Sequence, residues 1–165
     1  MSEASGATLH MLCGKIAAGK STLAARLSES GNTVLLSEDH LLSRLYPGEI
    51  TTIDDYARCV ARLREAIGAH VISLLKDGIS VVLDFQANTP AARGWMRGLF
   101  ESAGARHQLH YLHTPDETCR SRLRVRNAAV THDYQVSEAD FDLFTRFFVP
   151  PLAEEGFSVL PYQSN

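Results

Sequence analysis

The chain has 165 residues, of which 45% are hydrophobic and 21% charged. These values are typical of a soluble globular protein and exclude disordered, collagen-like and membrane compositions. The formal net charge of −3 gives no support to a large nucleic-acid surface, which usually shows a strong basic excess. We therefore expect one domain over residues 1–165, long enough to bury one substantial core.

The cysteines and the N-terminus bear on the cellular compartment. Cys13, Cys59 and Cys119 are widely separated and form no CxxC pair, so we expect reduced, buried thiols. No apolar run approaches the roughly 20 residues of a membrane span. The N-terminus MSEASGATLH carries an acid where a signal peptide would carry bases. These features predict a cytoplasmic protein that does not engage a membrane.

Apolar runs of strand length alternate along the chain with longer segments of helical period. This alternation is typical of a parallel sheet with crossover helices, and it predicts an α/β fold with a five-stranded, mainly parallel sheet and helices on both faces. The stretch SVVLDF is apolar without alternation, so we expect it in the middle of the sheet, covered on both sides. The five predicted strands are Leu9–Cys13, Thr33–Ser37, Ile79–Phe85, Gln108–His113 and Phe157–Leu160.

The helical segments between these strands have readable ends. Thr52 and Asp55 form an acidic variant of a capping box, and Asp77-Gly78 is expected to stop the helix that follows it. Apolar residues recur between these ends at steps of three or four. Further helices are expected to open at Pro90 and run to about Gly104, to open at Pro115, and to open at Ser137 with Asp140 as its capping partner, while Pro150-Pro151 interrupts the last helical stretch.

A phosphate-binding pattern lies between the first predicted strand and the first helix. The stretch GKIAAGKS fits G-x-x-x-x-G-K-[ST] at every fixed position. Glycines at 14 and 19 let the backbone turn with its N–H groups inward, which makes an anion cradle at the positive end of the following helix. Lys20 would reach the terminal phosphates, Ser21 would take a magnesium coordination site with Thr22 packed behind it, and the variable Lys15 would point to solvent. The predicted nucleotide-binding residues are Gly14, Lys15, Ile16, Ala17, Ala18, Gly19, Lys20, Ser21 and Thr22, and the expected cofactors are ATP and Mg²⁺.

Two carboxylates follow predicted strands at the edge where open α/β sheets bind ligands. Asp84 ends the third strand and could hold magnesium beside Ser21; the alternative is a loop carboxylate or a helix cap. Asp39 follows the second strand and could accept the proton of an attacking hydroxyl. Its alternative role is the N-cap of the next helix, which Ser37 or Glu38 could also supply.

Four arginines alternate in the stretch CRSRLRVRNA. On a helix, Arg120 and Arg124 form one stripe, and Arg122 and Arg126 form another about 160° away, because each step of two residues turns the chain by roughly 200°. Only one stripe can face a nucleotide and stabilise the charge that spreads in phosphoryl transfer; the alternative for either is a solvated basic face. Residues of about 127–136 then form a polar segment of lid length, which could close over the phosphates.

Taken together, these residues resemble a branch of the P-loop kinases. This branch includes polynucleotide kinase, zeta-toxin-like and chloramphenicol-phosphotransferase-like enzymes, and many small ATP-dependent kinases with AAA-type ATP binding. The segment LSEDHLLSRL is similar to the family's Ser-Asp segment with its later arginine, and VVLDFQANTPAARG is similar to its strand-ending acid, Asn/Thr pair and following arginine. RLRVRN resembles the lid-helix element R-L-x-x-R. The resemblance implies that Asp39 is the base for the substrate hydroxyl, that Arg122 and Arg126 contact ATP phosphates, and that Asp39, Arg44, Asn88 and Arg93 lie on the substrate side.

The resemblance implies a kinase that transfers the γ-phosphate of Mg-ATP to a hydroxyl, with Lys20, Asp39, Arg122 and Arg126 as catalytic residues. One departure bears on the acceptor: Leu42 stands where relatives often have a second base three positions after the first acid. This departure and the near-neutral charge favour a small-molecule acceptor. Two alternatives stay open, namely a kinase of a polynucleotide 5′-hydroxyl and a non-catalytic module whose binding depends on the nucleotide.

Histidines and aromatic residues receive structural interpretations. His107, His110 and His113 share one strand at spacings that do not put all three on one face, so no metal site is expected there. The aromatic residues at helical spacing near the C-terminus are expected in the core. They are Phe141, Phe144, Phe147 and Phe148.

Overall fold

A five-stranded parallel sheet forms the centre of the protein. The structure is a computed structural model that describes residues 6–129 and 135–164. The strand order is β2-β3-β1-β4-β5, and all four neighbouring pairs are parallel. The predicted α/β class and five-stranded sheet are confirmed. The strands are β1 (Thr8–Cys13), β2 (Thr33–Ser37), β3 (Ser80–Gln86), β4 (Arg106–His113) and β5 (Val159–Gln163).

The last strand begins two residues later than predicted and continues through Pro161. Proline cannot donate a hydrogen bond to a neighbouring strand, so the sequence pattern placed the end of the strand before it. β5 lies at the edge of the sheet and pairs with β4. An edge strand tolerates proline because one of its sides has no strand to bond with.

Six α-helices and one short 3₁₀ helix occur among the described residues. Both predicted capping boxes are present, since Thr52 exchanges hydrogen bonds with Asp55 and Ser137 does so with Asp140. The helix that Pro90 opens ends before Gly104, which adopts the left-handed φ of 63°. The helices are α1 (Lys20–Ser28), α2 (Glu38–Leu45), α3 (Ile53–Lys76), α4 (Pro90–Ala103), α5 (Asp116–Ala129) and α6 (Glu138–Phe147), followed by the 3₁₀ turn Ala153–Glu155.

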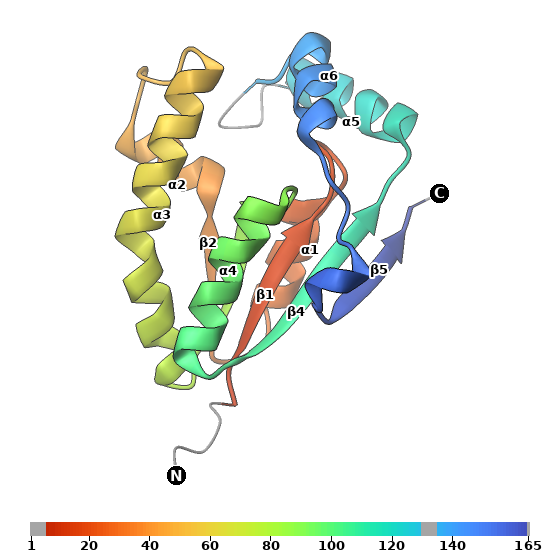
Figure 1. The fold of residues 1–165 in the computed structure, drawn as a ribbon. Helices are drawn as coiled ribbons and strands as arrows, with labels where there is room; N and C mark the ends of the chain where they lie inside the picture. Colours follow the sequence, from red (N-terminus) through yellow and green to blue (C-terminus); the bar gives the residue numbers. More distant parts are fainter. Residues whose placement is uncertain (1–5, 130–134, 165) are drawn as a thin grey trace.

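The helices cover both faces of the sheet, with α3 and α4 on one side and α1 on the other (Figure 1). Alternate strand residues divide between these faces. Met11 and Leu83 pack in the main core with residues of α3 and α4, whereas Leu12 and Val82 pack with Ala24 of α1. β3 is thus an inner strand covered on both faces, as its apolar run predicts. The middle position itself belongs to β1, so the expectation that SVVLDF is the central strand is wrong by one place.

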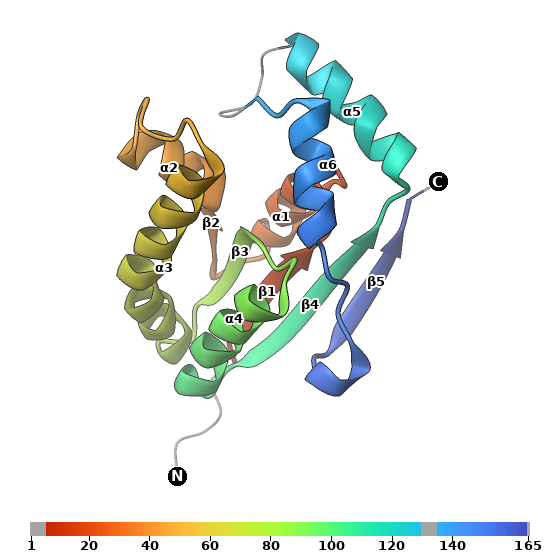
Figure 2. The same cartoon turned by 45° about the horizontal axis from the view of Figure 1, so that its top comes forward.

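Because the strands are parallel, all of them end at the same edge of the sheet. In the turned view, α5 and α6 lie on one side of this edge, and α2 with the start of α3 lies on the other (Figure 2). Most of the predicted lid, at residues 130–134, lies outside the described residues. Within residues 6–129 and 135–164, none of the helices combines the length and the hydropathy needed to cross a bilayer.

Candidate functional site

A pocket of about 920 Å³ opens at the carboxyl edge of the sheet. Its walls come from the loop 16–19 and the start of α1, the starts of α2 and α3, the end of β3, and the helices α5 and α6. Open α/β sheets bind their ligands at this edge. The pocket is therefore the place to compare with the predicted site.

The loop between β1 and α1 has the backbone geometry of an anion cradle. Gly19 has a φ of 108° and Ala17 a φ of 61°, both in the left-handed region. At Gly14 an added Cβ would lie 3.2 Å from Ala18 Cβ and 3.3 Å from the carbonyl oxygen of Leu112, so a larger residue would fit there only if these neighbours moved by a few tenths of an ångström. Such a loop turns successive N–H groups toward one point at a helix N-terminus.

Lys20, the first residue of α1, follows this loop and lines the pocket. Its Nζ donates to the carbonyl oxygens of Gly14 at 2.6 Å and Lys15 at 2.8 Å. Burial lowers the pKa of Lys20, and the neighbouring carboxylate of Asp84 opposes this shift. The ammonium group is thus held at the base of the loop, in the place expected of a phosphate-binding lysine.

Ser21 and Asp84 meet, as the sequence predicts. The Ser21 hydroxyl donates to Asp84 Oδ2 at 2.8 Å. The pairing of β1 with β3 shifts register beside Asp84, because Met11 pairs with Leu83 while the next residue, Leu12, pairs with Gln86. A bulge of this kind redirects the side chains of the strand that contains it. Hydroxyl and carboxylate oxygens are the ligands that Mg²⁺ prefers, so this pair fits a magnesium site that phosphate oxygens and water would complete.

Asp39 also lines the pocket, in the first turn of α2. The N-cap of α2 is Ser37, whose side chain accepts from the backbone N–H of His40, so the alternative role of Asp39 as the cap is excluded. The charge of Asp39 raises the pKa values of Lys20 and Arg126 against the lowering by burial. Asp39 therefore acts electrostatically on Lys20 and Arg126, two of the cations that line the same pocket.

The helix α5 presents one of its two arginine stripes to the pocket, and the structure decides which. Arg122 and Arg126 line the pocket. Arg122 donates to the carbonyl oxygen of Ala18 at 3.2 Å, and the buried Nε of Arg126 has no hydrogen-bond partner among the described residues. The other stripe forms ion pairs on α6, from Arg120 to Asp142 and from Arg124 to Glu138.

Two expectations for the phosphate loop are wrong in detail. Lys15 does not extend freely into solvent, because its Nζ forms an ion pair with Asp116 at 2.6 Å and lies 5.6 Å from the ring centre of Phe148. Thr22 does not pack behind Ser21, because it is exposed and lines the pocket. In both cases the surroundings of the side chain depend on how the loop packs against α1 and α5. The motif does not specify that packing.

Three expected substrate residues lie outside the pocket lining. Arg44 is exposed in the last turn of α2. The side-chain amide of Asn88 bonds to the backbone of Gly14, and Arg93 is completely buried and paired with Glu155. Their positions do not support the expected contacts with a substrate.

The structure adds an acidic and aromatic wall that the sequence did not indicate. Glu38 is 2% exposed and accepts a hydrogen bond from the Tyr56 hydroxyl at 3.0 Å, while Arg64 lies 3.5 Å away. Burial raises the pKa of Glu38 to about 7. Phe144, expected in the core, packs edge-on against Tyr56 at 5.8 Å and lines the pocket. The signal available in the sequence was the acid next to Asp39; the stripe that contains Tyr56 reads as ordinary helix core.

On the face of the sheet that α1 covers, a series of polar side-chain contacts through two histidines leads away from the pocket. Tyr162 lines the pocket, and its hydroxyl lies 2.8 Å from Nδ1 of His110. Nε2 of His110 lies 3.0 Å from Nδ1 of His10. Among residues 6–129 and 135–164, no group of three or more His, Cys, Asp or Glu side chains is arranged to hold a metal ion.

Comparisons with known proteins agree with this geometry. The sequence model of the AAA domain family matches residues 9–151. Among curated protein sequences, none matches the chain. Many solved structures share its fold, among them three at 16–21% identity.

The first is a candidate kinase from Chloroflexus aurantiacus, with 21% identity, a TM-score of 0.75, and coverage of 96% of this chain and 85% of the other. The second is the Mycobacterium tuberculosis APS kinase CysC in complex with AMPPNP and APS, with 21% identity, a TM-score of 0.61, and coverage of 98% and 90%. The third is Chaetomium thermophilum Kti12 in complex with ADP-AlF3, with 16% identity, a TM-score of 0.64, and coverage of 93% and 89%. The sequence match and the shared architecture together show that the chain belongs to the AAA domain family and has the fold of the small P-loop kinases.

Proposed function

We propose that the protein is a nucleotide-dependent kinase that transfers the γ-phosphate of Mg-ATP to a hydroxyl of a small molecule. One observation carries this proposal: the phosphate loop with Lys20, the bonded pair of Ser21 and Asp84, and the carboxylate Asp39 all line a single pocket. A pocket that only held a nucleotide would need the loop and the magnesium ligands. The additional carboxylate gives it a group that can take a proton.

Each of these side chains has a role that follows from its position. The loop N–H groups and Lys20 bind the β- and γ-phosphates, and Ser21 and Asp84 hold Mg²⁺. ATP supplies the phosphoryl group when it is bound. Asp39 accepts the proton that the acceptor hydroxyl loses as its oxygen bonds to the γ-phosphorus, while the bond from that phosphorus to the bridging oxygen breaks and ADP leaves.

Arg122 and Arg126 extend from α5 into the pocket, where they would stabilise the negative charge on the transferred group. Burial lowers the pKa of Arg126, so its guanidinium gains from an anionic partner in the pocket. Within residues 6–129 and 135–164 the Nε of Arg126 has no hydrogen-bond partner, so it is a donor available to such an anion. Two of the structural neighbours, which contain AMPPNP and ADP-AlF3, support the use of a nucleotide.

A small-molecule acceptor is supported by charge and by the pocket wall. Leu42, at the position where relatives often have a second base, is completely buried in the main core and brings no charge to the pocket. The net charge of −3 is unlike that of a protein that binds a polynucleotide through its backbone phosphates. Tyr56 and Phe144 supply an aromatic wall suited to the body of a small molecule.

The test is a phosphate-transfer screen with γ-labelled ATP and magnesium. Hydroxyl-bearing metabolites, antibiotics and oligonucleotides with a free 5′-hydroxyl are offered in parallel, and label is counted in the acceptor instead of in free phosphate. We expect label in a small-molecule acceptor. Label in oligonucleotides alone would contradict the acceptor class, and ATP binding without transfer to any acceptor would indicate a nucleotide-dependent binding module.

Asp39→Asn tests the base, and Asp54→Asn is its matched control. Both residues are the second of their helices, and both replacements remove a charge that favours a helix N-terminus. Asp54 is exposed and lies outside the pocket lining. Asp39→Asn should lower the transfer rate about 10²–10⁴-fold with ATP affinity retained. An Asp39→Asn protein with the full transfer rate would remove the base role.

A further inference from the structure

The loop after β3 is bonded to the phosphate loop through the side chain of Asn88. The N–H of Gly14 donates to Asn88 Oδ1 at 2.9 Å, and Asn88 Nδ2 donates to the carbonyl oxygen of Gly14 at 2.8 Å. One amide group therefore engages both backbone polar groups of the first glycine of the motif. The same carbonyl oxygen accepts from Lys20 Nζ at 2.6 Å. Asn88 thus fixes the peptide group that in turn holds the Lys20 ammonium.

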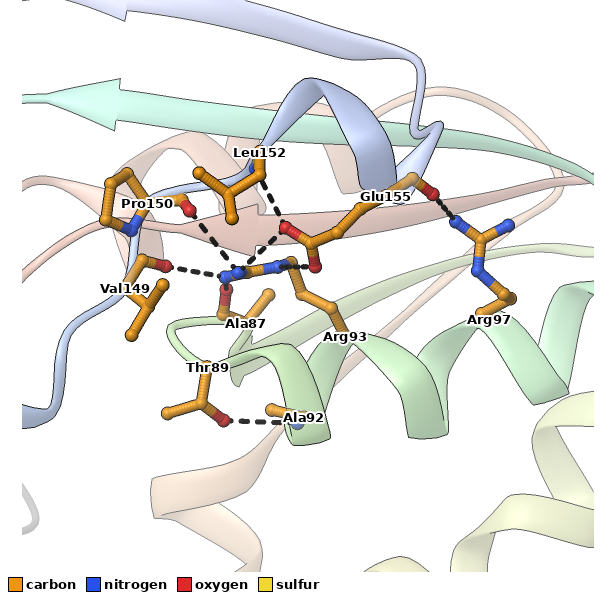
Figure 3. Close-up of polar contacts among 9 residues, drawn as sticks. All are labelled: Ala87, Thr89, Ala92, Arg93, Arg97, Val149, Pro150, Leu152 and Glu155. Carbon is orange, nitrogen blue, oxygen red and sulfur yellow. Dashed lines mark hydrogen bonds and ion pairs between the residues drawn. The ribbon is translucent and has the colours of Figure 1, made fainter.

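The backbone around Asn88 is itself held from two sides. The N–H of Ala87 donates to the carbonyl oxygen of Leu12 at 3.0 Å, and the carbonyl oxygen of Asn88 accepts from the N–H of Val149 at 2.9 Å. The guanidinium of Arg93 donates to the carbonyl oxygens of Ala87 and Val149, each at 2.9 Å. In Figure 3 this guanidinium lies among those carbonyl groups. The loop before α4 and the chain after α6 are thereby joined at Asn88.

The anchor of this arrangement is an ion pair inside the protein. Arg93 is completely buried, and it donates to the two carboxylate oxygens of Glu155 at 2.8 and 3.1 Å (Figure 3). Glu155 also accepts from the N–H of Leu152 at 2.8 Å, which fixes the short turn that carries it. Because every one of these groups is fixed by the fold, the Asn88 amide has its orientation before any ligand is present.

We propose that Asn88 is a positioning residue for nucleotide binding: it holds Gly14 and Lys20 in the arrangement that receives phosphate, and Arg93 keeps Asn88 in place. The inference rests on the proposed nucleotide site. Its physical basis is preorganisation, because a loop that is already ordered loses less conformational entropy when the ligand binds. Asn88 therefore acts on the nucleotide site through the phosphate loop. This role takes the place of the direct contact with a substrate that the resemblance implies for Asn88.

Asn88→Ala and its neighbour Thr89→Ala form a matched pair. The Thr89 hydroxyl accepts from the N–H of Ala92 at 3.1 Å and caps α4, so its loss lowers stability without removing a bond to the phosphate loop. Calorimetric titration of each protein with Mg-ATP gives the dissociation constant. We expect Asn88→Ala to raise it about tenfold, the loss of roughly one good hydrogen bond, and Thr89→Ala to change it less than about twofold.

A second readout and a second variant separate positioning from general stability. In Asn88→Ala the amide proton of Gly14 should exchange with solvent faster, while those of β1 keep their protection. Asn88→Asp keeps the size and the acceptor for the Gly14 N–H, but it has no donor for the Gly14 carbonyl oxygen, so it should also weaken Mg-ATP binding.

The outcomes are distinct. Wild-type protein that binds no Mg-ATP would overturn the proposed function. Wild-type binding together with unchanged affinity in both Asn88 variants, or an equal loss in Thr89→Ala, would overturn the positioning role alone. If neither Asn88 variant folds, Asn88 serves folding itself and the positioning role is likewise overturned.

Discussion

Replacing Arg93 by methionine should destabilise the protein strongly, because it leaves a buried network without its donor. Arg93 is 0% exposed and donates to the carboxylate of Glu155 and to the carbonyl oxygens of Ala87 and Val149. Removing one partner of a buried ion pair costs about 3–5 kcal/mol of folding free energy. The Glu155 side chain is 19% exposed and can regain some water, which favours the lower end, about 3 kcal/mol.

The assay is urea unfolding followed by circular dichroism, with Arg58→Met as the control. Arg58 pairs with Asp55 at 3.2 Å, but its side chain is 52% exposed, so the same replacement should cost less than about 1 kcal/mol. For a chain of this size, about 3 kcal/mol corresponds to a fall in Tm of roughly 6–12 °C. A loss below about 1 kcal/mol in Arg93→Met would refute the argument that this network holds the chain after α6.

Two further predictions concern pH and the arginine stripes. Burial, with a smaller effect of His10, lowers the pKa of His110 from 6.5 to about 4, so the unfolded chain binds the proton more tightly. Stability should therefore be complete above pH 6.5 and fall toward pH 4, by no more than about 3 kcal/mol from this group, and His110→Gln should flatten the slope of unfolding free energy against pH. Arg126→Gln should lower the transfer rate at least about tenfold, whereas Arg124→Gln, which breaks an exposed ion pair with Glu138, should leave it within about twofold; equal rates in the two variants would contradict the choice of stripe.

Much of the fold could be predicted from local patterns. The capping boxes at Thr52 and Ser137 and the left-handed Gly104 mark helix ends that the structure confirms. These signals act over a few neighbouring residues, so they can be recognised in the sequence without knowledge of the tertiary structure. The end of β5 was less readable, since the tolerance for Pro161 depends on its being an edge strand.

The candidate site could also be predicted in part. Ser21 and Asp84 were expected to meet because parallel strands bring their carboxyl ends to one edge, and they do meet. The role of Asn88 could not be predicted, because its partner Gly14 is 74 residues away and depends on the adjacency of β1 and β3. Glu38 and Tyr56 were missed because only the docking of α3 against α2 brings them together.

The sequence by itself determined the phosphate loop, the alternation of strands and helices, and the residues that begin or end several of the helices, because these depend on backbone conformation and short-range spacing. Tertiary structure alone decided which arginine stripe enters the pocket, that Arg93 is anchored to Glu155, and that Asn88 binds Gly14. Those choices depend on how separate elements pack, and packing sets side-chain neighbours across distances in the chain that periodicity does not constrain.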